Sequence, residues 1–87
     1  MSLFKLKIST PDGNRYDGEA FMLSLRGIEG DLAILAGHIP FITSVKAGEC
    51  KLELEDGSIR IGSCDGGLLT VSNEVVTLLA GSFKWNE

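Results

Sequence analysis

Short runs in which apolar and polar residues alternate are the feature that most constrains this chain. Phe4, Leu6 and Ile8 alternate with polar neighbours, and similar runs follow one another between turn-forming residues. A helix would repeat its apolar positions every third or fourth residue, and no such period occurs in the sequence. Alternating runs separated by turns at about 8–12-residue spacing are typical of an all-β sandwich or barrel.

The chain has 87 residues, which predicts one domain over residues 1–87. Its apolar fraction of 44% is ordinary for a globular domain, and no apolar run approaches the roughly 20 residues that a membrane-spanning helix needs. The net charge is −4, with no cluster of Lys or Arg. This charge pattern disfavours binding to nucleic acids and to anionic lipid surfaces. We therefore expect a soluble domain with no direct membrane insertion.

The first return strand is expected to run from about Arg15 to Arg26, after a turn over residues 11–14. Simple counting across that turn would place charged residues opposite Leu6 and Ile8. One extra residue near Gly18 would instead place Leu6 opposite Ala20, so we expect a β-bulge at this glycine.

The Asp56-Gly57 dipeptide is a strong signal for a two-residue hairpin turn. Counting outward from it pairs Leu54 with Ile59 and Leu52 with Ile61, on one apolar face. This register is the basis for an expectation about the two cysteines.

In that register Cys50 faces Ser63, whereas Cys64 points to the opposite side of the sheet. Side chains on opposite faces cannot meet the geometry of a disulfide. Both cysteines are therefore interpreted as small apolar fillers of a protein from a reducing compartment.

A last hairpin is expected to turn at Asn73-Glu74. Both faces of this hairpin carry apolar residues, which predicts that it is covered on both sides. The predicted pairs are Val71 with Val76, Leu69 with Leu78, and Leu68 with Leu79.

Few side chains are candidates for catalysis. His38 is the only histidine, and a thiol hydrolase would have to combine it with a cysteine such as Cys64. One histidine and two divergent cysteines do not make up the ligand set of a metal site. Glu29 and Asp31 form a carboxylate pair that is expected to keep an exposed loop soluble. We therefore expect no cofactor and no enzymatic activity, but a module that acts through its surface.

The stretch GIEGDLAILAGHIP combines a short apolar run with several residues that bend the backbone. Its spacing, together with the stretches at residues 10–13, 41–48, 66–71 and 76–80, resembles the amino-terminal domain of the epsilon subunit of F-type ATP synthases, called delta in mitochondria. The residues that carry the motif are Gly27, Gly30, Asp31, Leu32, Leu35, Gly37, His38 and Pro40.

This resemblance implies a two-layer antiparallel β-sandwich of about ten short strands. It also implies a non-catalytic rotor subunit that contacts the gamma subunit and the c-ring loops, at the cytoplasmic face of a bacterial plasma membrane. Asp31, His38 and Glu29 are the expected partner-binding residues, with Asp31 and His38 near one end of the sandwich. The residues expected to shape the loops are Gly27, Gly30, Gly37 and Pro40.

Some positions depart from the family pattern. Ala36 and Gly81 replace residues usual in the family, Phe83-Lys84-Trp85 is not family-like, and the carboxy-terminal helical hairpin of the family is absent from the sequence. Two alternatives remain open: His38 as a hydrogen-bonded loop anchor, and the whole chain as a small-ligand-binding β-sandwich. Phe83 and Trp85 are interpreted either as a cap on the end of the core or as part of a surface that a missing segment would cover.

Overall fold

The computed structural model describes residues 2–86, so the first and last residues of the predicted domain lie outside it. This part of the chain forms ten β-strands and no helix, which confirms the predicted all-β class. No helix long and apolar enough to cross a bilayer is found among these residues. The strands are β1 (Phe4–Thr10), β2 (Gly13–Ala20), β3 (Met22–Gly27), β4 (Gly30–Leu35), β5 (Phe41–Val45), β6 (Gly48–Glu53), β7 (Ile59–Cys64), β8 (Gly67–Val71), β9 (Val76–Ala80) and β10 (Phe83–Trp85).

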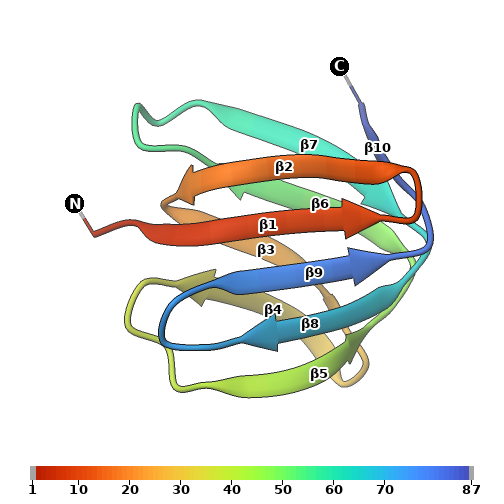
Figure 1. Ribbon diagram of the computed structural model, residues 1–87, viewed down its shortest axis with the longest axis horizontal. Helices are drawn as coiled ribbons and strands as arrows, with labels where there is room; N and C mark the ends of the chain where they lie inside the picture. The colour runs from red at the N-terminus through yellow and green to blue at the C-terminus, as the bar shows by residue number, and fades with distance from the viewer. Residues whose placement is uncertain (1, 87) are drawn as a thin grey trace.

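The strands fold into two layers that face each other (Figure 1). Their hydrogen-bonded order is β10-β7-β6-β3-β5-β8-β9-β1-β2, with β4 on the other side of β3. Strands β3 and β5 share only the pair Gly27 and Val45, and the sheet folds over at this point. Strands β1 and β9 run parallel, whereas the other pairs among residues 2–86 are antiparallel. The predicted sandwich is thus confirmed, with one parallel pairing that the sequence did not indicate.

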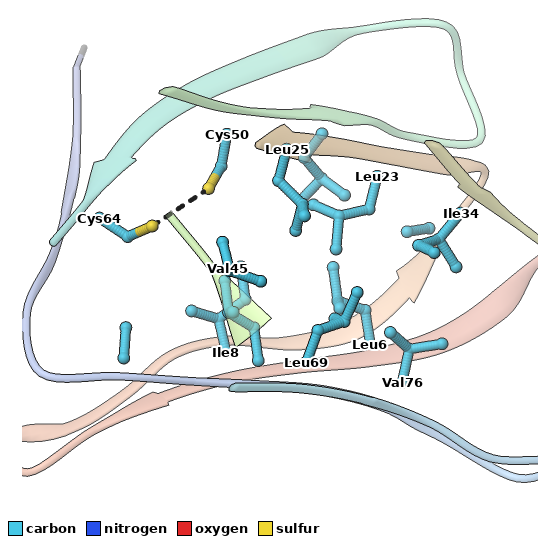
Figure 2. Close-up of a cluster of buried hydrophobic side chains, with 14 of the residues drawn as sticks. Leu6, Ile8, Leu23, Leu25, Ile34, Val45, Cys50, Cys64, Leu69 and Val76 are labelled. Carbon is cyan, nitrogen blue, oxygen red and sulfur yellow. Dashed lines mark hydrogen bonds between the residues drawn. The ribbon is translucent and has the colours of Figure 1, made fainter. Parts of the chain in front are cut away.

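The core lies between the layers, where inward-pointing leucines and isoleucines from both layers pack together (Figure 2). Leu6 and Ile8 are fully buried, as the alternation in the first strand predicts. Burying a side chain of this size contributes roughly 1.5–3 kcal/mol. The other fully buried leucines are Leu23, Leu52, Leu69 and Leu78.

The β8–β9 hairpin has the predicted register. Val71 pairs with Val76 and Leu69 pairs with Leu78, around a turn centred on Asn73 and Glu74. The expectation that the hairpin is covered on both sides is wrong, because Leu68 and Leu79 point away from the core and remain 40% and 48% exposed.

The β6–β7 hairpin is out of the predicted register by one residue. Its turn has three residues between Leu54 and Ser58, because the backbone N–H of Leu54 donates to the Ser58 carbonyl. Gly57 adopts φ 86°, which suits the left-handed position of such a turn. The Asp56 carboxylate accepts hydrogen bonds from the Ser58 backbone N–H at 2.9 Å and from its hydroxyl at 2.6 Å. These contacts favour the longer turn over the predicted two-residue turn.

One added turn residue changes every pairing along this hairpin. Leu52 faces Arg60 instead of Ile61, and Cys50 faces Gly62 instead of Ser63. The predicted cysteine orientation is therefore wrong, since Cys50 and Cys64 occupy the same face and are both buried. A one-residue slip moves side chains to the other face because the strand period is two.

The β1–β2 hairpin contains a bulge, but not at Gly18. The register shifts between Ile8, which pairs with Tyr16, and Ser9, which pairs with Asn14, so Arg15 is the extra residue. Leu6 consequently pairs with Gly18 rather than Ala20. The single return strand expected over residues 15–26 is also wrong, because β2 ends before position 21 and β3 begins after it.

Candidate interaction surface

The motif segment forms strand β4 and two corners at its opposite ends (Figure 1). We call the β3–β4 turn, with Glu29 and Asp31, the acidic corner, and the loop over residues 36–40 the histidine corner. Strand β4 has six residues, and at about 3.3 Å per residue it separates the corners by roughly 20 Å. The expectation that Asp31 and His38 lie near one end is therefore wrong.

Two glycines shape the acidic corner. Gly27 pairs with Gly30 across the two-residue turn. A Cβ atom on Gly27 would lie 2.8 Å from the Gly30 carbonyl oxygen and from the Leu32 side chain, so only glycine fits there. Glu29 is exposed in the turn, and Asp31 is exposed opposite Arg26. Among residues 2–86 neither carboxylate has an ion-pair partner, so both are free to contact another molecule.

The histidine corner projects its side chains into solvent. Gly37 turns the chain at φ 85°, a conformation that favours glycine, and Pro40 ends the loop before β5. The His38 ring lies 6.2 Å from the Phe41 ring, and within the described chain it makes no hydrogen bond. The interpretation of His38 as a hydrogen-bonded anchor therefore gains no support from the structure. Ile39 beside it is 80% exposed.

A shallow pocket of about 280 Å³ lies beside the histidine corner. The start of β1, the β8–β9 turn and the loop around His38 line it, with Lys5 and Glu74 among the charged groups. Pockets that hold drug-sized ligands usually measure about 300–1,000 Å³ and are mostly apolar. Neither the size nor the lining of this pocket favours the small-ligand alternative.

An apolar patch on the outside of the β5-β8-β9 layer was missed at the sequence level. Leu68 pairs directly with Leu79, and Ile42 on β5 shares their face of the sheet. These three residues, which we call the outer apolar face, are 40%, 48% and 67% exposed respectively. Leu68 and Leu79 are direct neighbours, and Ile42 lies diagonal to Leu68. Exposed apolar side chains that gather on one face mark protein interfaces. The signal in the sequence was the presence of apolar residues on both faces of β8 and β9.

The arrangement required for a thiol hydrolase is not formed. Cys64 lies buried at the end of β7, where its contacts are Cys50 and the Lys46 carbonyl. His38 belongs to the loop between β4 and β5, and this loop lies at the other end of the sandwich from the end of β7 (Figure 1). Nor do three or more His, Cys or carboxylate side chains gather as a metal site within residues 2–86. The described surface offers an acidic corner, a corner with an exposed histidine and isoleucine, and an apolar face, a combination suited to protein contact.

Known proteins are similar to this chain in sequence. Residues 3–86 match the family described as ATP synthase, Delta/Epsilon chain, beta-sandwich domain. The ATP synthase epsilon chains of Bacillus velezensis and Bacillus subtilis are 42% and 41% identical over 80 residues, which is 92% of this chain. The chain spans 60% of the length of both relatives.

Two solved structures are similar in fold. One is the Euglena gracilis mitochondrial ATP synthase, OSCP/F1/c-ring, with a TM-score of 0.91, 21% identity and coverage of 98% of this chain and 54% of that one. The other is the central stalk/c-ring of the Tetrahymena thermophila mitochondrial ATP synthase, with a TM-score of 0.76, 15% identity and coverage of 92% and 64%. With the family match over nearly its whole length, this chain belongs to the ATP synthase delta/epsilon-chain β-sandwich family.

Proposed function

We propose that this chain is a non-catalytic part of the rotor of an F1Fo ATP synthase, where it links the gamma subunit to the c-ring. The observation that carries this proposal is the family match over residues 3–86. In this role the sandwich passes torque between proton translocation and ATP synthesis, while the reaction itself takes place on other subunits. The complex holds the chain peripherally at the cytoplasmic face of a bacterial plasma membrane.

The two corners support contact with two partners. Because β4 separates them by roughly 20 Å, one corner can meet the gamma subunit while the other meets the c-ring loops. Asp31 and Glu29 offer carboxylates without an intramolecular ion pair in the described chain, and His38 offers an imidazole without a hydrogen bond there. Polar groups in this state lose no internal hydrogen bond or ion pair when they bind a partner, which favours an interaction role over a structural one.

The outer apolar face adds support of a different kind. Charged and polar side chains give orientation and selectivity, whereas exposed apolar side chains provide most of the free energy of protein association. Ile42, Leu68 and Leu79 lie on one face of a rigid layer, so they present a preformed surface. A domain that transmits torque needs such rigidity at its contacts.

A chimeric enzyme tests the proposal directly. In the Bacillus subtilis epsilon chain, the aligned 80-residue region is replaced by the matching part of this chain. We expect the folded chimera to copurify with the gamma subunit and the c-ring, and energised membrane vesicles that contain it to synthesise ATP. A folded chimera that copurifies with neither partner would refute the proposal.

Single substitutions in the chimera test the two corners. Asp31→Ala and His38→Ala are each expected to reduce recovery of at least one partner. Asp17→Ala is the matched control, since Asp17 is an exposed carboxylate on β2, outside both corners. Equal recovery with all three variants would show that the corners do not form the contacts.

A further inference from the structure

The two cysteines face each other inside the sandwich (Figure 2). Cys50 on β6 is 2% exposed and Cys64 on β7 is 7% exposed, and both thiols are free. Their Sγ atoms are 3.7 Å apart. The three-residue turn of this hairpin places them at diagonal positions on one face, since Cys50 pairs with Gly62 and Cys64 pairs with Gly48.

No side chain of the two paired strands lies between the two sulfur atoms. Each cysteine has a glycine directly opposite it, so no side chain from the partner strand separates the two thiols. The Phe83 ring takes up the room above Gly62, where an added Cβ atom would lie 2.5 Å from the ring. Phe83 also pairs with Cys64, so the three-residue edge strand β10 covers this thiol. Cys64 retains 7% exposure despite this cover, so it is the thiol that a small reagent can approach.

Exposure and the environment of Cys50 distinguish the two thiols. The Cys50 thiol donates to the Cys64 sulfur, and the Cys64 thiol lies 3.9 Å from the Lys46 carbonyl oxygen as a donor. Burial, followed by the neighbouring Cys64, raises the pKa of the Cys50 thiol to about 12, so Cys50 stays protonated. Cys64 is the more exposed of the two thiols, at 7% against 2%, and it lies at the end of β7. A small reagent therefore reaches Cys64 first, and Cys50 is placed to react second.

We propose that Cys50 and Cys64 form a redox-sensitive dithiol that a small peroxide converts into an intramolecular disulfide. The Cys64 thiolate attacks one peroxide oxygen, the O–O bond breaks, and the leaving hydroxide takes up the Cys64 proton as water. The Cys50 sulfur then attacks the resulting Cys64 sulfenic acid. The S–S bond forms, the S–O bond breaks, and the second oxygen leaves as water with the Cys50 proton. The two thiols lose two electrons to the peroxide, which is reduced to two waters.

We expect the bond to form without loss of the fold. The sulfur atoms must approach from 3.7 Å to about 2.05 Å, which requires side-chain rotation and a small shift of the strands. Strands β6 and β7 are already hydrogen-bonded neighbours, so the disulfide would join two strands that are paired in the reduced protein. A disulfide formed with such adjustment is reduced more easily than an unstrained structural one. We therefore expect a reversible modification rather than a permanent link.

Mass spectrometry of the folded chain tests this inference. The reduced protein is treated with hydrogen peroxide, the peroxide is removed with catalase, and N-ethylmaleimide is added under denaturing conditions. The expected product takes up no maleimide, has a mass lower by two hydrogen atoms, migrates as a monomer on a non-reducing gel and keeps its β-type circular dichroism. Dithiothreitol should restore two maleimide-reactive thiols. Two reactive thiols after peroxide, or a disulfide only between chains, would overturn the proposal.

Two matched variants test the order of the steps. In Cys50→Ala the sulfenic acid at Cys64 has no partner, so dimedone should label Cys64. In Cys64→Ala the buried Cys50 should stay reduced and unlabelled under the same conditions, and equal labelling of both variants would contradict the assigned roles. If either variant does not fold, peptide mapping of the wild-type chain after limiting peroxide and dimedone decides which cysteine reacts first.

Discussion

The indole Nε1 of Trp85 donates a 3.0 Å hydrogen bond to the carbonyl oxygen of Arg15, which lies 70 residues earlier in the chain. Arg15 is the extra residue of the β1–β2 bulge, and a bulge leaves such a residue outside the ladder. Its carbonyl is therefore available to a side chain. The contact joins β2 to β10, the strands at the two ends of the hydrogen-bonded order, and thereby closes the open side of the sandwich.

Aromatic and cationic contacts reinforce this closure. The Trp85 ring meets the Tyr16 ring edge-on at 6.4 Å and the Phe83 ring at 4.8 Å. The Arg60 guanidinium carbon lies 4.0 Å from the centre of the Trp85 ring. The aromatic end that departs from the family pattern therefore has a structural role, and Phe83 is buried as the predicted cap on the core requires.

Trp85→Phe tests the closing hydrogen bond. The variant keeps an aromatic ring but leaves the Arg15 carbonyl without its donor, so we expect a loss of about 1 kcal/mol in the free energy of unfolding. Urea unfolding measures the change, with Lys84→Ala as a control at an exposed neighbouring position. Identical unfolding midpoints for wild type and Trp85→Phe would show that the contact does not stabilise the fold.

Leu52→Ala tests the inward face of β6. Leu52 is 1% exposed, so removing most of its side chain should cost about 2–5 kcal/mol through lost burial and the cavity left behind. Ile59→Ala is the matched control, because Ile59 is 49% exposed on the neighbouring strand and should change stability by no more than about 0.5 kcal/mol. Chemical denaturation of both variants measures the difference. A loss below about 0.5 kcal/mol for Leu52→Ala would contradict its inward orientation.

Ser58→Ala tests the turn that sets the β6–β7 register. The Ser58 hydroxyl and then the Ser58 backbone N–H lower the pKa of the Asp56 carboxyl by donating to the charged form. Because the pKa is lower in the folded state, the stabilisation is present above the unfolded value of about 3.9 and is lost as the pH falls through the folded value. The substitution should raise the pKa of Asp56 toward its ordinary value, and an NMR titration of the carboxyl carbon measures it. An unchanged pKa would mean that the hydroxyl does not hold the turn.

His38→Ala separates a contact residue from a structural one. The exposed imidazole makes no hydrogen bond within the described chain, so the substitution should alter the free energy of unfolding by no more than about 0.5 kcal/mol. Gly37→Ala is the contrasting variant, because a side chain at φ 85° is strained by roughly 1–2 kcal/mol. Thermal melting compares the two. A large drop in melting temperature for His38→Ala would identify the histidine as an anchor of the loop.

Local signals in the sequence predicted the strand register correctly in the β8–β9 hairpin, where the turn and its two strands are neighbours in the chain. The β8–β9 hairpin has every predicted pair, because its apolar residues and its turn indicate the same register. The exposure of Glu29, Asp31 and His38 also follows from polar residues placed among glycines and a proline. The predictions of individual turn conformations were wrong, because a few polar contacts within each turn decide its conformation. In the β6–β7 turn, two hydrogen bonds to Asp56 accompany one added residue, and that residue reverses the predicted orientation of the cysteines.

The sequence by itself determined the all-β class, most of the core and the residues of the motif. The alternation of apolar and polar residues within each strand is a local property of the sequence. Only the tertiary structure decided that the two corners lie at opposite ends of β4, that Cys50 meets Cys64, and that Trp85 reaches Arg15. These relationships depend on the register of paired strands and on contacts across the layers. A one-residue change in a turn alters that register without altering the pattern of apolar residues.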